Sequence, residues 1–83
     1  MKVTVKYFAS IREALGQGSE TVDTSAGSLA ALREELIARG GAHAQALAHG
    51  KSVRVALNQV MSDESVALAE GCEVAFFPPV TGG

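Results

Sequence analysis

Residues 73–83 read Glu73-Val74-Ala75-Phe76-Phe77-Pro78-Pro79-Val80-Thr81-Gly82-Gly83, and this stretch is the best guide to the fold. The largely apolar run 73–77, followed by prolines, is typical of a strand buried on much of both faces. Pro78 and Pro79 fix φ and lack N–H donors, so a sheet ladder cannot continue through them. The two glycines leave the last carboxylate without neighbouring side-chain bulk. We therefore expect a domain over residues 1–78 and a thin tail at 79–83.

The tail at 79–83 carries the functional interpretation. Fully extended, residues 80–83 would reach about 13–14 Å beyond the fold, at roughly 3.3–3.6 Å per residue. Because glycine adopts backbone conformations closed to other residues, such a tail can enter a narrow channel. We interpret Gly83 as the residue whose carboxylate reacts, inside the active site of another protein. The alternative is a frayed tail without function, which is common at the ends of domains.

Residues 2–8 alternate between polar and apolar side chains, which is typical of a half-buried strand. Val3, Val5 and Tyr7 share one face, which we expect to be the inner one. Phe8 falls on the opposite, polar face. It either packs under a neighbouring loop or contributes to a patch that binds a partner protein.

The last strand raises the same question for Phe77. If Val74 and Phe76 pack on the core, alternation leaves Phe77 on the outer face, at the root of the tail. Phe77 then either fills a second core layer or joins Phe8 in docking a partner. Arg12 is either a solvated helix residue or a charge at the rim of the same patch.

Two helices are predicted in the first half of the chain. Ser10 has the spacing of a capping box with Glu13, which predicts a short helix to Leu15. Ser28 is a good N-cap for a longer helix over residues 29–39. The longer helix carries one apolar stripe, which comprises Leu29, Leu32, Leu36 and Ile37.

Three further strands complete the predicted sheet. Residues 19–23 read as a strand antiparallel to the first, residues 53–57 alternate again, and a turn at Asn58-Gln59 leads into a short apolar segment. We expect the first and last strands to lie side by side and parallel at the centre. The order of elements predicts an α+β roll, a mixed sheet packed on one long helix.

Composition limits the classes of function. The chain has 83 residues, 47% of them hydrophobic and 19% charged, which indicates one globular domain. A net charge of −2 without a basic run argues against a nucleic-acid partner. No apolar run approaches the ~20 residues that span a bilayer, so we expect no membrane partner. No phosphate loop or catalytic dyad is evident, and we expect no self-contained active site.

The single cysteine and the two histidines are predicted to be structural or surface residues. One cysteine excludes an internal disulfide and fits a reducing cytoplasm. Acidic Glu73 beside Cys72 would not lower the pKa of the thiol, so Cys72 is interpreted as a small structural residue. His43 and His49 lack the spacing of a helical metal pair, so both are interpreted as surface residues. The alanine-rich segment 42–50 that contains them predicts at most one helical turn.

The order of elements and the Gly-Gly end resemble the ubiquitin-like β-grasp fold over the whole chain. Residues 73–83 strongly resemble the C-terminus of the small subunit of molybdopterin synthase, the MoaD family. Residues 5–13, with Phe8, Ala9, Arg12 and Glu13, resemble the opening strand and turn of that family. Residues 56–59, Ala-Leu-Asn-Gln, resemble its middle strand.

This resemblance implies a sulfur carrier that holds no cofactor permanently. An adenylyltransferase of the ubiquitin-activating type would use ATP to adenylate Gly83, and a sulfurtransferase would convert the adenylate to a thiocarboxylate. The tail residues Pro79, Val80, Thr81 and Gly82 would thread into the large subunit of the synthase. Two sulfur transfers there would turn cyclic pyranopterin monophosphate into molybdopterin, within a hetero-oligomer expected to be a heterotetramer. Phe8, Arg12 and Phe77 would form the docking face.

Three alternatives remain open from the sequence. A sulfur carrier for thiamine thiazole synthesis would share the fold, the Gly-Gly end and the chemistry. A ubiquitin-like modifier would use Gly83 to form isopeptide bonds with lysines. A plain interaction module would carry an inert tail.

Overall fold

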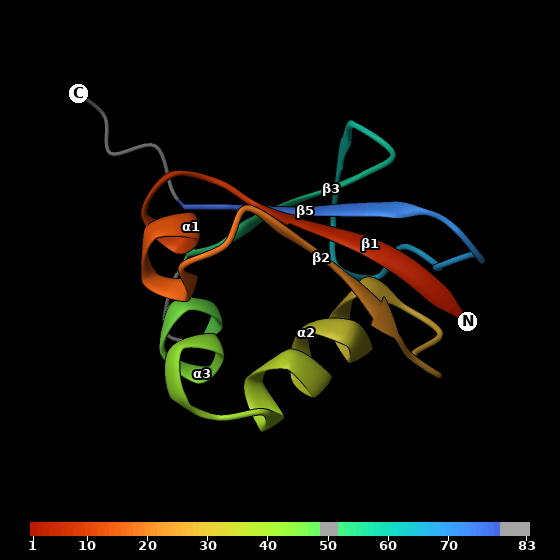
Figure 1. Ribbon diagram of the computed structural model, residues 1–83. Coiled ribbons are helices and arrows are strands. Elements are labelled where there is room, and N and C mark those ends of the chain that lie inside the picture. The colour runs from red at the N-terminus through yellow and green to blue at the C-terminus, as the bar shows by residue number, and fades with distance from the viewer. Residues whose placement is uncertain (49–51, 79–83) are drawn as a thin grey trace.

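The computed structural model describes residues 1–48 and 52–78, which form a mixed five-stranded sheet with helices on one face (Figure 1). The strands are β1 (Lys2–Tyr7), β2 (Ser19–Asp23), β3 (Arg54–Leu57), β4 (Val60–Ser62) and β5 (Glu73–Phe77). The helices are α1 (Ala9–Leu15), α2 (Leu29–Ala38) and α3 (Gly41–Leu47). The strand order is β2-β1-β5-β3-β4.

β5 lies at the centre of the sheet, as its apolar sequence predicts. It pairs in parallel with β1, where Val5 lies beside Val74, and antiparallel with β3, where Val55 lies beside Phe76. β1 also pairs antiparallel with β2. The expected arrangement, with the first and last strands adjacent and parallel, is confirmed.

The core fills the space between the sheet and the helices. Val74 and Phe76 of β5 and Val5 of β1 are completely buried on the inner face. The stripe on α2 meets them with Leu29, Leu32 and Leu36, all completely buried, while Ile37 is partly buried. Each such side chain contributes about 1.5–3 kcal/mol of hydrophobic stabilisation, so this stripe fixes α2 against the sheet.

α1 begins two residues earlier than the capping-box spacing predicts. The helix starts at Ala9, so Ser10 lies inside it, and Phe8 occupies the N-cap without a side-chain hydrogen bond. The Phe8 carbonyl instead accepts from the backbone N–H groups of Ile11 and Arg12, at 3.1 and 3.3 Å. The chain turns sharply at Ala9, where φ is 50°, and this turn sets the start of the helix. The predicted Ser10 cap is therefore wrong.

A third helix, α3, adds to the two that were predicted. Ser28 caps α2 by accepting from the N–H of Ala31, at 3.2 Å, as predicted. After α2, Gly40 adopts a φ of 75° and reverses the chain into α3. α3 spans residues 41–47 rather than a single turn, because its small alanines allow close packing and Leu47 is completely buried. His49 lies outside the described residues.

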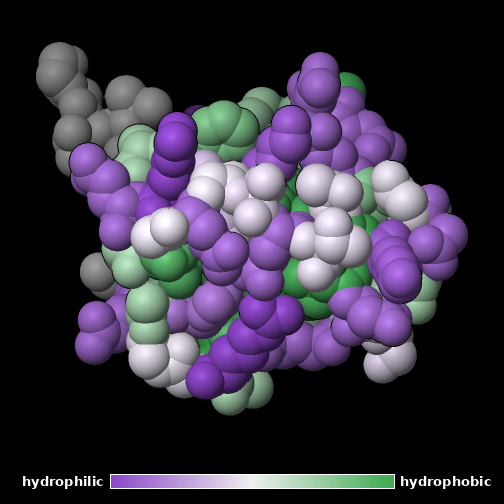
Figure 2. All heavy atoms as spheres, viewed as in Figure 1, coloured by the Kyte–Doolittle hydropathy of each residue, from purple (hydrophilic) through white to green (hydrophobic). Residues whose placement is uncertain are grey.

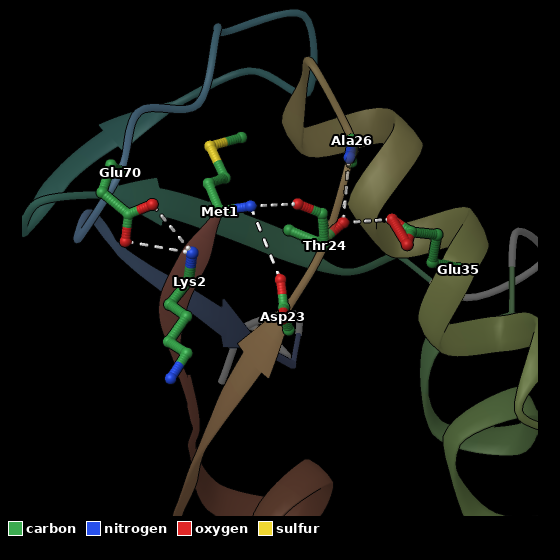
Figure 3. Close-up of polar contacts among 7 residues, drawn as sticks. All are labelled: Met1, Lys2, Asp23, Thr24, Ala26, Glu35 and Glu70. Atoms are coloured by element: carbon green, nitrogen blue, oxygen red, sulfur yellow. Dashed lines mark hydrogen bonds and ion pairs between the residues drawn. The ribbon is translucent and has the colours of Figure 1, made fainter.

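The first two residues are tied, directly or through Thr24, to three other parts of the fold (Figure 3). The Met1 ammonium donates to the Thr24 carbonyl at 2.9 Å and lies 3.5 Å from Asp23. The Thr24 hydroxyl contacts the Glu35 carboxylate on α2 and accepts from a backbone N–H of the loop before α2. The backbone N–H of Lys2 is shared by both carboxylate oxygens of Glu70, at 3.2 and 3.1 Å. These bonds fix the start of β1 against β2, α2 and the loop before β5.

Candidate partner-docking site

Phe8 and Phe77 form a stacked pair on the outer face of the sheet. Their ring centroids are 4.6 Å apart and their planes differ by 10°. Phe8 is 40% exposed and Phe77 is half-buried, and neither belongs to the core on the helix side. The pair lies where β5 ends and Pro78 follows. The structure thus brings together the two aromatic residues that alternation placed on this face.

The backbone explains why Phe8 stays on the outer face. Phe8 keeps the extended conformation of β1, with φ −126° and ψ 154°, so its side chain continues the alternation of the strand. Its N–H donates to the Phe76 carbonyl at 3.2 Å, which extends the parallel ladder to the end of β5. The helix begins only at the next residue. Phe8 therefore lies across the ladder from Phe77, where the rings can stack.

β4 adds an exposed apolar surface that the sequence analysis did not assign. Met61 is 57% exposed and lies beside Ala56, which in turn lies beside Ala75. Residues paired across strands point to the same face, so Met61 shares the outer face with Phe77. We name Phe8, Met61 and Phe77 the outer-face patch. The two alanines between them, Ala56 and Ala75, are buried, at 3% and 4% exposed.

Hydrophilic side chains predominate on the side of the molecule seen in Figure 2, which has the view of Figure 1, and hydrophobic residues show between them and at the edges. Exposed large apolar side chains among the described residues are limited to Phe8, Val60 and Met61. Phe8 and Met61 belong to the outer-face patch, whereas Val60 pairs with Leu57 and so lies on the other face of the edge strand β4. Two of the three exposed large apolar side chains thus lie on the outer face, which favours the patch as an interaction surface.

Arg12 lies one helical turn after Phe8, and its side chain extends toward the turn before β2. It is exposed on α1, and its side chain covers Gly18 in the turn before β2. A Cβ on Gly18 would lie 3.3 Å from the Arg12 Nε. The structure therefore gives Arg12 a packing role at this turn, and its assignment to the docking face stays a prediction.

The predicted tail lies outside the described residues. Pro79, Val80, Thr81, Gly82 and Gly83 therefore keep the role given to them by the sequence, as a prediction. Pro78 is half-buried and follows β5 directly, so β5 does end at the double proline.

A charged cluster around Glu20 holds the helices to the β1–β2 hairpin. The Glu20 carboxylate accepts from the Tyr7 hydroxyl at 2.7 Å and from Arg39 at 2.8 Å, and the Nε2 of His43 lies 3.0 Å away. Only 17% of the His43 side chain is exposed. The interpretation of His43 as a plain surface residue is therefore wrong, because α3 packs it onto a carboxylate that is distant in sequence.

The cluster shifts the pKa of two of its members. Burial opposes ionisation of Glu20, but the hydrogen bonds from His43, Arg39 and Tyr7 outweigh it and lower the pKa of Glu20 from 4.5 to about 2. Burial, with the hydrogen bond to Glu20, raises the pKa of the Tyr7 hydroxyl far above its usual value. Glu20 thus remains charged and Tyr7 neutral over the physiological range.

Glu20→Gln is expected to destabilise the fold near pH 7 by about 1–3 kcal/mol, because the lowered pKa of Glu20 reflects favourable contacts of the carboxylate. Those contacts contribute fully above the ordinary pKa and are lost as the pH falls from about 4.5 toward 2. The difference in the free energy of unfolding between the unchanged protein and Glu20→Gln should therefore shrink as the pH falls through that range. Urea unfolding at several pH values measures it. Glu13→Gln, at an exposed position on α1, is the matched control, and an equal pH dependence in both variants would refute the assignment.

Arg33 is a buried charge that the sequence analysis also missed. Arg33 is only 3% exposed. Its guanidinium donates to the carbonyls of Leu47 and Ala48, both at 2.8 Å, and to the Glu64 carboxylate at 2.6 Å. These bonds tie α2 to the end of α3 and to the loop after β4. Arg33 follows Leu29 by four residues and so lies on the buried side of α2, but its residue type pointed to the surface, since arginine is ordinarily a surface residue.

The remaining candidate residues add no reactive site. Cys72 is a free thiol, 5% exposed within the core, which agrees with its interpretation as a structural residue. Within residues 1–48 and 52–78, no three His, Cys, Asp or Glu side chains are grouped so that they could hold a metal ion. None of the described helices is long and apolar enough to cross a bilayer.

Comparisons with known proteins agree with this geometry. A model described as the ThiS family matches residues 5–83. A molybdopterin synthase sulfur carrier subunit of Haemophilus influenzae is 40% identical over 81 residues, covering 98% of this chain and 99% of that protein.

Two solved structures share the fold. Small archaeal modifier protein 1 of H. volcanii matches with a TM-score of 0.76 and 26% identity, over 95% of this chain and 98% of that one. A chain in the complex of subunits 1 and 2 of the molybdopterin-converting factor from Helicobacter pylori matches with a TM-score of 0.70 and 26% identity, over 100% of both chains. The expected β-grasp fold is confirmed, and this chain belongs to the MoaD/ThiS family, together with the molybdopterin synthase sulfur carrier subunits.

Proposed function

We propose that this protein is the sulfur carrier subunit of a molybdopterin synthase. The observation that carries the proposal is 40% identity to such a subunit over almost the whole of both chains. The structure supports it with an apolar outer-face patch beside the end of β5, so that a bound partner would lie next to the point where the tail leaves the domain.

The chemistry takes place at Gly83. A carboxylate is a poor electrophile, so its oxygen first attacks the α-phosphate of ATP on an activating enzyme and releases pyrophosphate. A sulfurtransferase then supplies sulfur at the oxidation level of sulfide, which displaces AMP and leaves the terminus as a thiocarboxylate. The thiocarboxylate sulfur is a soft nucleophile, as a thiolate is, and bonds to the pterin precursor. Water then cleaves the acyl–sulfur bond, which leaves the sulfur on the pterin and restores the carboxylate of Gly83. The carrier needs no base of its own, since partner residues supply acid–base catalysis.

The large subunit is proposed to bind the outer-face patch and to receive the tail 79–83 in its active site. A complex of subunits 1 and 2 of the Helicobacter pylori factor is known as a structure, and its matching chain has the same fold. Bulk at Gly82 would place a β-carbon in the narrow channel and block entry. Intact mass spectrometry of the carrier from its host tests the chemistry, because loading replaces one oxygen by sulfur.

Phe77→Asp is expected to weaken binding of the large subunit about 10- to 100-fold, because it places a charge in the apolar centre of the patch. Isothermal titration calorimetry with the purified large subunit measures this loss. The thermal midpoint should change little, since Phe77 lies outside the core. Thr21→Asp is the matched control, because Thr21 is exposed on the same face of β2, away from the patch. Unfolding of the Phe77 variant, or unchanged binding, would refute the docking assignment.

The fold also allows a protein modifier, and the similarity to small archaeal modifier protein 1 favours this second candidate. A modifier would form isopeptide bonds between Gly83 and lysines of other proteins. Conjugates in host extracts that disappear on deletion of Gly83 would support it. Binding to a thiazole synthase, without binding to the large subunit, would instead assign the chain to thiazole synthesis.

A further inference from the structure

A groove lies beside the outer-face patch, at the open end of the β3–β4 hairpin. It has a volume of about 720 Å³, and its walls include Val53, Arg54 and Met61. Met61 belongs to both the groove and the patch. Arg54 lies directly across the ladder from Phe77. A protein that covers the patch would therefore also cover the groove.

The two carboxylates of this groove already have partners within the domain. Glu64 accepts from buried Arg33 at 2.6 Å. Asp63 accepts from the backbone N–H of Ser65 at 2.8 Å and also from its hydroxyl. The hydrogen bonds from the Ser65 hydroxyl and backbone lower the pKa of Asp63, so this carboxylate stays ionised and turned toward Ser65.

Arg54 differs from these groups. Its side chain is exposed and makes no hydrogen bond or ion pair with any residue in the ranges 1–48 and 52–78. It lies between Phe77 and the Asp63 end of β4, yet Asp63 is bound to Ser65 instead. A planar guanidinium with five donors matches a carboxylate with two hydrogen bonds. An unpaired arginine at the edge of an apolar patch thus suits an acidic residue of a protein that covers it.

We infer that Arg54 determines specificity for the large subunit by pairing with a carboxylate on that subunit, beside an apolar side chain that contacts Met61 and Val53. This inference rests on the proposed function, because it takes the outer-face patch as the docking surface. Because Asp63 and Glu64 also line the groove, the occupant follows not from a net positive charge but from the guanidinium donors of Arg54. These donors have no partner within residues 1–48 and 52–78, so they suit a carboxylate of the large subunit. Such a pair at the edge of an interface acts mainly on the association rate and on the salt dependence of binding.

The test compares Arg54→Glu with Lys2→Glu in the full-length chain. Both changes alter the net charge equally, and both positions are exposed on the outer face, but Lys2 lies at the far end of β1. Binding to the purified large subunit is measured by calorimetry at low and at physiological salt. We expect Arg54→Glu to weaken binding at least about tenfold at low salt and Lys2→Glu less than about threefold. Arg54→Gln should weaken it several-fold and reduce the salt dependence.

The outcomes separate this inference from the proposed function. Equal effects of the Arg54 and Lys2 variants would show a long-range charge effect and overturn the pairing. If Phe77→Asp abolishes binding while Arg54→Glu leaves it unchanged, the docking face stands and the role of Arg54 is refuted. If neither variant weakens binding, the docking face itself fails. A lysine in place of the matching carboxylate of the large subunit should restore binding to the Arg54→Glu carrier and weaken binding to the unchanged one.

Discussion

Deletion of Gly83 is expected to abolish sulfur transfer while leaving the domain folded. Without this residue the acyl group would end at Gly82, too short to reach the reacting centre of either partner. The loss should be at least about 10³-fold, the scale seen when an enzyme loses its covalent nucleophile. The core should persist, because its buried side chains lie between Val3 and Phe76. In vitro synthesis of molybdopterin from its pterin precursor, with purified partners, measures the activity.

An extension after Gly83 provides the matched control. A carrier with several residues fused to Gly83 should be as inactive as the deletion, because its terminal carboxylate lies elsewhere. A cleavage site placed in the extension, so that a protease restores the Gly83 carboxylate, should return full activity to the same protein. An uncleaved extension that supports synthesis would show that the reaction does not require a free carboxylate at Gly83.

Arg33→Ala is expected to lower the free energy of unfolding by about 3–5 kcal/mol, the range for removing one partner from a buried charged pair. The change leaves the Glu64 carboxylate and the carbonyls of Leu47 and Ala48 without their donors. For a small domain this is a large part of the total stability. Urea unfolding near pH 7, followed by circular dichroism, measures the loss.

Arg39→Ala is the control for this prediction. Arg39 also pairs with a carboxylate, Glu20, at 2.8 Å, but 42% of its side chain is exposed. Solvent screens the exposed pair, so the expected cost is below about 1 kcal/mol. If the two variants lost similar amounts of free energy of unfolding, burial would not make the bonds of Arg33 more stabilising than those of Arg39.

The fold could be predicted because its main signals are local. Alternation over 2–8 and the apolar run 73–77 identify the two central strands, and the stripe on α2 identifies the face that covers them. α3 could not be predicted in the same way. Its alanines show no clear apolar face, and its position follows from the left-handed turn at Gly40 and the burial of Leu47.

The candidate site was predicted only in part. Alternation placed Phe8 and Phe77 on the outer face, and the structure shows that they stack. Met61 was not predicted to belong to the site. The face of the sheet on which it lies depends on the register between β3 and β4, which no local sequence pattern reveals. The partners of Glu20 and Arg33 were missed for a similar reason. They lie far away in the sequence, and only the packed structure brings them within hydrogen-bond distance.

The parallel pairing of β1 with β5 has a consequence for biosynthesis. These are the first and last strands of the chain, so β1 leaves the ribosome long before its partner is made. β5 is the last strand to be made, so the centre of the sheet can close only late in synthesis, after β5 has left the ribosome. Phe77 belongs to this strand, so the outer-face patch is complete only when the sheet has closed. A partner that recognises the patch would therefore select chains that have finished folding.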